Sequence, residues 1–439
     1  MVWNFPSLLL FMVVLLVYFI RPSWSFLLGL ITTPLLAPFM VLYSGIGDFQ
    51  EQQSYVWALW GVFNRAYLLI ILFEVFVRRK KLSSNLKVLI APGIILSFFL
   101  VFHNVVNHFD LSTMYGLLIG LVYTVPPMVV LMLNKEAWPS IKSLYWVVFI
   151  IYAIEIIWIP LNLMGVFAYS ARYQELISGE LDMICGTFTR SNMLADYVAF
   201  TYFFLVLDYL IRRKVPFLLF LVISIMAFIL LFAAGSKLPI VAVVISIMYS
   251  IVLFKKDKIG IVICALLVFA GIILFLSTNK IEPNTSYEGF NRIVGEMSTF
   301  VQSKVNKDED ESTFGISKEL LDNYFLSSPI VGNGYSYKGN DNAYPISRSG
   351  IDLSALKADA TFAYYLVEFG LMGTLLYIIF YYNVIKCACS FLPHYRKKIV
   401  LAVFLFYILF SATEGGLFSM SLYTYAYTFL FSFTRSYNE

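Results

Sequence analysis

Charged side chains and histidine are scarce in this sequence. Only 13% of its 439 residues are Asp, Glu, Lys or Arg, whereas soluble domains carry roughly 25%. This composition excludes an ordinary soluble domain. The 3 histidines do not cluster with carboxylates, and the sequence holds neither an HExxH motif nor a Cys/His ligand spacing. We therefore expect no metal site and no cofactor.

Cysteine is also rare, with 4 in the chain. Cys264 lies inside an apolar run, and Cys387 and Cys389 are expected in a basic loop on the reducing, cytoplasmic side. Cys185 is then the sole cysteine on the opposite side. The sequence therefore predicts no disulfide framework.

Apolar residues dominate instead, at 60% of the chain. Apolar runs of about 18 residues or more recur along most of its length, which is typical of an all-α polytopic membrane protein. The first run has no basic residue ahead of it and no small-residue cleavage site after it, so we interpret it as a retained helix. We expect about 12–13 transmembrane helices. The candidate spans are 3–20, 23–43, 55–77, 86–106, 111–133, 144–166, 192–211, 215–232, 238–254, 259–277, 361–385, 399–412 and 417–433.

One long polar segment, 278–360, interrupts the apolar pattern. It divides the chain into N-terminal transmembrane helices (1–277), a large loop (278–360) and C-terminal transmembrane helices (361–439). Connections longer than about 15 residues are uncommon unless they are functional or disordered. We therefore expect this loop to contribute to the functional site.

Basic clusters predict the orientation in the membrane. Four of them fall in short loops, at 78–81, 212–214, 255–258 and 396–398. The positive-inside rule assigns these loops to the cytoplasm. The large loop, the loop 165–191 and the turn 233–237 then share the opposite, external face, where we expect the substrate site.

Charged residues inside the apolar runs are candidates for function, because charge at membrane depth is costly. They are Arg65, Glu155, Asp196, Asp208 and Glu368. We interpret Asp208 with Arg212, and Glu74 with Arg78, as pairs four residues apart on one helix. Glu368 is interpreted as structural. For Arg65, a contact between helices and a contact with substrate are both open.

Few basic residues fall on the external face: Arg172, Arg190, Lys237, Arg292, Arg348 and Lys357. Arg190 and Lys237 adjoin expected helix starts, where a cation and free backbone N–H groups together suit an anion. Arginine suits a diphosphate because its guanidinium binds two oxygens at once. For Arg172 and Lys357, an ordinary solvated position in a loop is an equal alternative.

Five stretches of the sequence share a pattern with a known family. They are Gly186-Thr-Phe-Thr-Arg-Ser-Asn-Met-Leu-Ala-Asp-Tyr, Ala234-Gly-Ser-Lys-Leu, Gly289-Phe-Asn-Arg, Ser328-Pro-Ile-Val-Gly-Asn-Gly-Tyr and Tyr364-Tyr-Leu-Val-Glu-Phe-Gly-Leu-Met-Gly. In this order they resemble the O-antigen ligase and polymerase superfamily of bacterial envelope glycosyltransferases. There is one clear departure. Ligases of this superfamily carry a His-Asn pair where this chain has Asp359-Ala360. The departure favours the polymerase branch and leaves the general base open.

The resemblance implies an inner-membrane polymerase of O-antigen or a related surface polysaccharide. The implied reaction is an inverting, metal-independent glycosyl transfer between repeat units on undecaprenyl diphosphate, at the periplasmic face. Arg190, Lys237 and Arg292 would stabilise the charge that develops on the leaving diphosphate. Asp359 would be the base for the acceptor hydroxyl. Substrate contacts would come from Arg65, Arg348, Tyr335, Tyr337 and Tyr344, the tyrosines by stacking on sugars.

The expected partners are the undecaprenyl-diphosphate-linked oligosaccharide and polymer, the lipid bilayer and a chain-length regulator protein, and not nucleic acid. Two alternatives stay open. A ligase of the same superfamily would transfer the polymer to a lipid A core. A flippase or transporter of the lipid-linked glycan would show paired broken helices and charges along a path through the membrane. In this sequence the charge gathers at one face.

Overall fold

The structure, a computed structural model, describes most of the helical regions of the chain. The described residues are 5–44, 49–82, 84–107, 125–163, 186–188, 191–212, 215–234, 237–254, 325–326, 328–333, 361–392, 395–411 and 420–438. Within these ranges every regular element is helical and there is no strand. The predicted all-α class is confirmed for this part of the chain.

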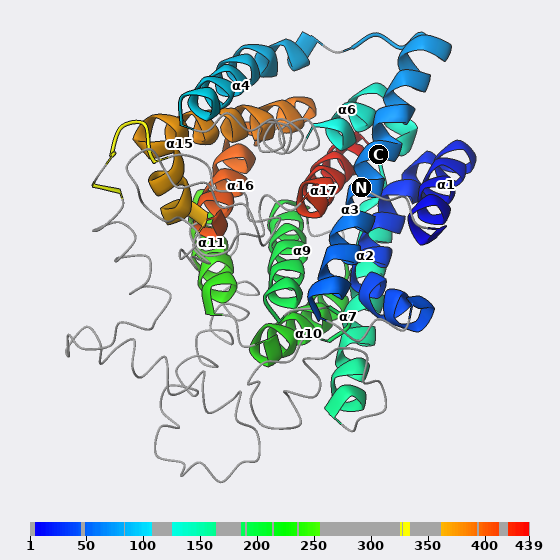
Figure 1. Cartoon of the computed structure of the whole chain (residues 1–439). Helices are drawn as coiled ribbons and strands as arrows, with labels where there is room; N and C mark the ends of the chain where they lie inside the picture. Colours follow the sequence, from blue (N-terminus) through cyan, green and yellow to red (C-terminus); the bar gives the residue numbers. More distant parts are fainter. Residues whose placement is uncertain are drawn as a thin grey trace, which may run out of the picture.

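The helices follow the predicted apolar runs closely (Figure 1). They are α1 Phe5–Ile20, α2 Pro22–Ser44, α3 Phe49–Leu72 with a π-helical end Phe73–Val77, α4 Lys87–Asn107, α6 Pro126–Leu133, α7 Ile141–Leu163, α9 Ser191–Arg212, α10 Phe217–Ala234, α11 Lys237–Phe254, α15 Thr361–Ala388, α16 Arg396–Ser411 and α17 Met420–Asn438. The expected span 259–277 lies outside the described residues. The expected span 111–133 is described only from residue 125, and is helical over α6.

Four helical stretches in the described residues are long and apolar enough to cross a bilayer: Ser84–His103, Lys135–Ile159, Met193–Arg212 and Tyr365–Phe391. Three shorter apolar helices accompany them: Phe5–Ile20, Phe217–Leu231 and Pro239–Phe254. The α9 stretch is wholly buried in the bundle, whereas α4 lies at its rim with Phe98 and Phe102 exposed. These helices give the protein the character of a membrane protein.

Contacts along α7 and α10 show that both run antiparallel to α9. The Tyr145 hydroxyl on α7 donates to the carbonyl oxygen of Leu205 at 2.9 Å, and about two turns further along α7 Tyr152 bonds to Thr201 at 2.6 Å. Near the end of α9, the ring of Tyr209 stacks on Phe220, close to the start of α10, with ring centroids 4.1 Å apart. Since α11 follows α10 after two residues, α9 and α11 begin at the same end of the bundle.

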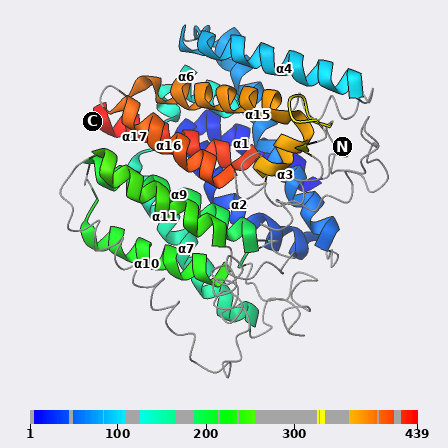
Figure 2. The ribbon, with the colours of Figure 1, turned by 90° about the vertical axis from the view of Figure 1, so that its left-hand side faces the viewer.

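The C-terminal helices also alternate in direction. The ring of Phe203 on α9 stacks on Phe406 of α16 at 4.2 Å, and Tyr381 of α15 contacts Tyr407 of α16 at 5.1 Å. Figure 2 shows the resulting order of neighbours, from α4 through α15, α16 and α9 to α10. Residue numbers fall along α16 as they rise along α9 and α15 in these pairs of rings, so α16 runs antiparallel to both. The helix α15 therefore begins at the same end as α9 and α11. We call this end, where α9, α11 and α15 begin, the loop end.

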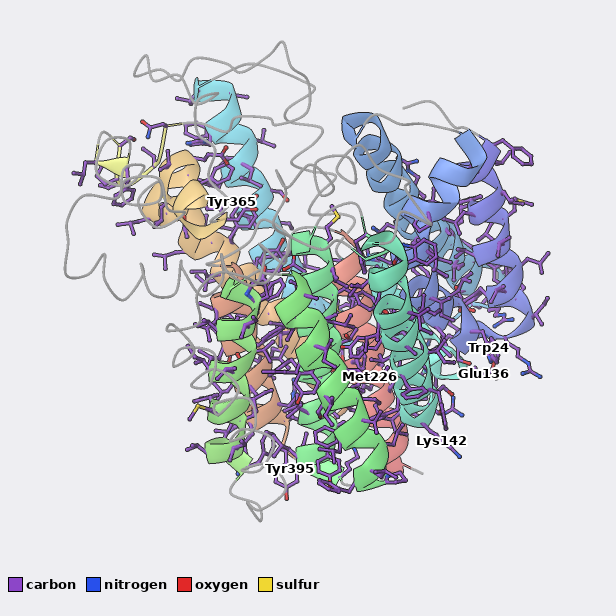
Figure 3. The ribbon with its side chains drawn as sticks, turned by 90° about the horizontal axis from the view of Figure 1, so that it is seen from below. Trp24, Glu136, Lys142, Met226, Tyr365 and Tyr395 are labelled. Atoms are coloured by element: carbon purple, nitrogen blue, oxygen red, sulfur yellow. The ribbon has the colours of Figure 1, made fainter. Side chains whose placement is uncertain are left out.

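The opposite end of the bundle carries nearly all of the described bases, and we call it the basic end. They are Arg21, Arg78, Arg79, Lys80, Lys81, Lys87, Lys135, Lys142, Arg212, Lys386, Arg396, Lys397, Lys398 and Arg435. Among the described residues, only Arg65 and Lys237 are bases elsewhere. In Figure 3, Trp24, Glu136, Lys142 and Tyr395 lie along the basic end, and Tyr365 lies toward the loop end.

In this region the structure adds one feature to the sequence expectations and shows that another expectation is wrong. The expected span 361–385 is helical over α15, with a break at Gly370, whose φ is 63° and ψ −169°. The apolar run continues across the break, so hydropathy gives no sign of it. Cys387 and Cys389 do not lie in a loop: they are buried thiols in the last turn of α15 and the 3-10 turn after it.

Candidate functional site

The predicted site residues lie mainly in segments outside the described residues. These are Arg190, Arg292, Asp359, Arg348, Tyr335, Tyr337 and Tyr344. Lys237 is the first residue of α11, at the loop end. Arg65 lies on α3 and is half-buried. The described residues nevertheless show how the chain enters α9 and which segment contacts the break in α15.

The turn 186–188, just before α9, is held by a buried glutamate. Glu155 on α7 is fully buried and accepts the backbone N–H of Thr187 on Oε2 at 2.9 Å. The Thr187 hydroxyl donates to the other carboxylate oxygen, Oε1. Gly186 has φ +59°, and a Cβ there would collide with Oε2 of Glu155. The position therefore requires glycine both for its conformation and for the approach of the carboxylate.

The same turn also packs against α9. The ring of Phe188 is 97% buried and contacts Tyr197, one and a half turns into α9, with ring centroids 5.5 Å apart. Thr187 is fully buried. The turn 186–188 is thus held on one side by α7 and on the other by α9. Arg190 follows Phe188 by two positions in the sequence and directly precedes α9.

A second contact fills the break in α15. The segment 328–333 lies across the break and pairs with it through the main chain. Leu371 and Met372 donate their N–H groups to the carbonyls of Pro329 and Ile330 at 2.9 and 3.0 Å. Asn333 donates both its backbone N–H and its side-chain amide to the carbonyl of Val367, at 2.8 and 3.2 Å. The backbone groups opened by the break are therefore satisfied by this segment.

Two glycines make this pairing possible. Gly332 has φ +77° and lies against the backbone of Glu368 and Gly370, while Gly370 lies against the backbone of Ile330 and Gly332. A Cβ at either glycine would collide with main-chain atoms of the other segment. The two glycines belong to two of the stretches that carry the family resemblance, so those two stretches are in direct contact.

Behind the break, α15 packs on the end of α4. The imidazole of His103 is buried between Phe99 and Phe369, with ring centroids 5.4 and 5.6 Å away. Glu368, next to Phe369 in the sequence, is fully buried. The Thr374 hydroxyl donates to the carbonyl of Gly370 at 2.7 Å, which satisfies a further group at the break.

Both predicted pairs of charges on single helices are confirmed. Arg212 Nε lies 3.5 Å from Asp208 Oδ1, and Arg78 Nη1 lies 3.1 Å from Glu74 Oε1. Glu74 also pairs with Lys80 at 3.0 Å and accepts the hydroxyl of Tyr18 at 2.7 Å. These contacts are at the basic end, so the buried acids Glu74 and Asp208 belong to the packing of helix ends.

Sequence reasoning missed the role of Glu155 in holding the turn before α9. The available signal was Gly186 in the Gly-x-Phe stretch, because a glycine just before a helix suggests a backbone that a side chain would obstruct. Within the described part of the chain, no three His, Cys, Asp or Glu side chains are grouped so that they could hold a metal ion. Comparisons of the sequence with protein-family models and with curated proteins found no match.

Proposed function

We propose that this protein is a glycosyltransferase that polymerises O-antigen or a related surface polysaccharide from repeat units on undecaprenyl diphosphate. One observation supports this proposal most. Three of the stretches that carry the family resemblance, around Gly186, Gly332 and Gly370, make glycine-dependent contacts in the part of the bundle away from the basic end. Their glycines are thus required by the fold of this chain, and this supports reading the stretches as parts of one arrangement.

In the proposed topology the basic end faces the cytoplasm and the loop end faces the periplasm of the inner membrane. The gathering of the described bases at one end supports this orientation through the positive-inside rule. About 12–13 spans and a periplasmic loop at 278–360 complete the topology. A reporter fused at Asp310 is expected to read periplasmic and one at Lys397 cytoplasmic; the reverse would contradict the proposal.

In the proposed reaction, an acceptor sugar hydroxyl attacks the anomeric carbon of the growing chain. The new C–O bond forms as the bond to the diphosphate breaks, with inversion, and the hydroxyl proton passes to Asp359. Undecaprenyl diphosphate leaves with the electron pair. Arg190, Lys237 and Arg292 stabilise its charge, because fixed cations in a water-poor site lower the barrier for an anionic leaving group. The substrate contacts are Arg65, Arg348, Tyr335, Tyr337 and Tyr344.

The break in α15 bears on the transporter alternative. Broken helices in transporters leave backbone groups free to bind a substrate or an ion. In this protein the groups at Val367, Leu371 and Met372 bond to the segment 328–333 of the same chain. This arrangement favours a structural break over a transport site. For the ligase alternative, Asp359-Ala360 in place of His-Asn favours the polymerase.

Deletion of the gene tests the proposed function. We expect cells that carry single repeat units, or none, on the lipid carrier or surface glycolipid, and no long chains. Chain length is measured by gel electrophoresis of the extracted glycolipid, with the gene restored on a plasmid as the control. Accumulation of long polymer on undecaprenyl diphosphate would show a ligase instead.

A further inference from the structure

We propose that Glu155 and Thr187 are positioning residues: their contact fixes the turn before α9, and the rate of polymerisation depends on this turn through Arg190, the residue that directly precedes the helix in the sequence. This inference rests on the proposed function and assigns a role to two residues outside the predicted site. It begins from the burial of Glu155, a carboxylate inside a helix long and apolar enough to cross a bilayer. A buried carboxylate is costly unless it is hydrogen-bonded, so its partners reveal its role.

The partners of Glu155 belong to the turn before α9. The carboxylate accepts two donors of the single residue Thr187, the backbone N–H and the hydroxyl. A two-point contact fixes the orientation of the peptide unit as well as its position. Gly186, whose φ is +59°, brings that peptide close enough for the contact. Glu155 therefore fixes the path by which the chain enters α9.

A second contact between the same two helices provides a comparison. Tyr152 on α7 bonds to the Thr201 hydroxyl at 2.6 Å, and both residues are fully buried. Thr201 lies within α9, so this contact joins one helix body to another. Thr187 is equally buried but precedes α9. The Thr201 hydroxyl also bonds to the carbonyl of Tyr197 in its own helix at 2.7 Å, and Tyr152 bonds to the carbonyl of Val198 at 3.1 Å. The two threonines thus differ in what their bonds hold, the helix body at Thr201 and the turn before the helix at Thr187, and in that only Thr187 bonds to a carboxylate.

The turn 186–188 lies close to Arg190 in the sequence, so a change in the turn is expected to affect Arg190. Only two residues separate Phe188 from Ser191, the first residue of α9, and Arg190 is one of them. A displacement of about 1 Å at a catalytic group can cost about 100-fold in rate. Loss of a bond that holds the turn is therefore expected to lower the rate of transfer more than it lowers stability.

Two isosteric variants test this inference. Thr187→Val and Thr201→Val each remove one buried hydroxyl at the interface between α7 and α9. The proteins are purified and reconstituted in lipid nanodiscs with an undecaprenyl-diphosphate-linked repeat unit. The measured quantities are the maximal polymerisation rate and the midpoint of thermal unfolding. We expect Thr187→Val to lose about 10- to 100-fold in maximal rate, and Thr201→Val to retain its rate with only a small loss of thermal midpoint, because Tyr152 keeps its bond to the carbonyl of Val198.

Two further variants sharpen the result. Thr187→Ser keeps both donors and should restore most of the rate. In an Arg190→Ala background, Thr187→Val should cost little more, because residues that act through one group are not additive. Equal losses of rate and midpoint in Thr187→Val and Thr201→Val, or full additivity with Arg190→Ala, would overturn the positioning role alone. A wild-type protein that makes no polymer would overturn the proposed function, and this role with it.

Discussion

The two ends of the bundle satisfy their buried acids with different partners. At the basic end, Glu74 pairs with Arg78 and Lys80, and Asp208 pairs with Arg212. Toward the loop end, Glu155 accepts the backbone N–H and the hydroxyl of Thr187. Cations thus neutralise the acids at the basic end, whereas neutral donors hold the acid that lies near the start of α9.

The basic residues at the two ends are expected to have different roles. Arg212 and Arg435 donate to the main-chain carbonyls of Phe433 and Trp138, so they join the ends of helices that are far apart in sequence. We expect such residues to contribute to stability. Arg190 and Lys237 adjoin helix starts at the loop end, and in the proposed function they bind a diphosphate. We expect these residues to contribute to rate.

The largest effect is expected where the contacts depend on glycine. Gly370→Ala introduces a Cβ against the backbone of Ile330 and Gly332, at backbone angles (φ 63°, ψ −169°) that only glycine adopts readily. Neither the helix nor the segment 328–333 can move aside without breaking main-chain hydrogen bonds. We expect a loss of several kcal/mol, on the order of 3 or more, seen as little folded protein in membranes and a much lower thermal midpoint.

Gly93→Ala provides the matched control for this prediction. Gly93 lies on α4 at the contact with α15, and a Cβ there would lie 3.5 Å from the ring of Phe380, an ordinary van der Waals contact. We expect little change or a small gain, since alanine favours a helix by about 1 kcal/mol over glycine. Equal behaviour of the Gly93 and Gly370 variants would contradict the importance of the segment 328–333.

The next largest effect is expected on rate, at the loop end. Arg190→Ala and Arg292→Ala should each cost about 100- to 1,000-fold in polymerisation, as for other fixed donors that stabilise developing charge. Lys237→Arg should be tolerated because it keeps the cation, and Arg190→Lys should recover only part of the rate because lysine lacks the bidentate geometry. Chain length at matched protein level is the measurement.

Arg172→Ala and Lys357→Ala are the controls for these variants and should be close to silent. A normal chain length in both the Arg190→Ala and Arg292→Ala proteins would exclude the assigned site. The bases at the loop end would then have no demonstrated role in the reaction. The Glu155 contact would serve only the packing of α7 on the turn 186–188.

Helix bounds and contacts within one helix could be predicted from the sequence. Contacts between segments that are distant in the sequence could not. Helix bounds agree within a few residues because apolar run length determines them, and the Asp208–Arg212 pair was predictable because both residues share one helix. Glu155 and Thr187 lie 32 positions apart, and Asn333 and Val367 lie 34 apart. No periodicity links such residues. The break at Gly370 was missed because the residues on both sides of it remain apolar.

A loss of stability without loss of turnover is expected from Asp208→Ala. Asp208 is 99% buried, and its partner Arg212 is nearly as buried. Removal of the acid leaves a buried guanidinium without its counter-charge, which typically costs about 3–5 kcal/mol. The turnover of the protein that does fold should stay near normal, because the pair lies at the end of α9 opposite to Arg190. A specific loss of turnover at unchanged thermal midpoint would contradict the division between the two ends.

The smallest effect is expected from Arg78→Ala, although Arg78 also pairs with a buried acid. The Arg78 side chain is 37% exposed, so its guanidinium is partly hydrated. Glu74 keeps Lys80 at 3.0 Å and the Tyr18 hydroxyl at 2.7 Å, and is not left without partners. We expect a loss of about 1 kcal/mol, near the upper end of the range for ion pairs at a surface, measured by thermal unfolding beside Asp208→Ala. A loss as large as that of Asp208→Ala would show that the number of ion pairs at the basic end, and not the burial of each partner, determines what they contribute.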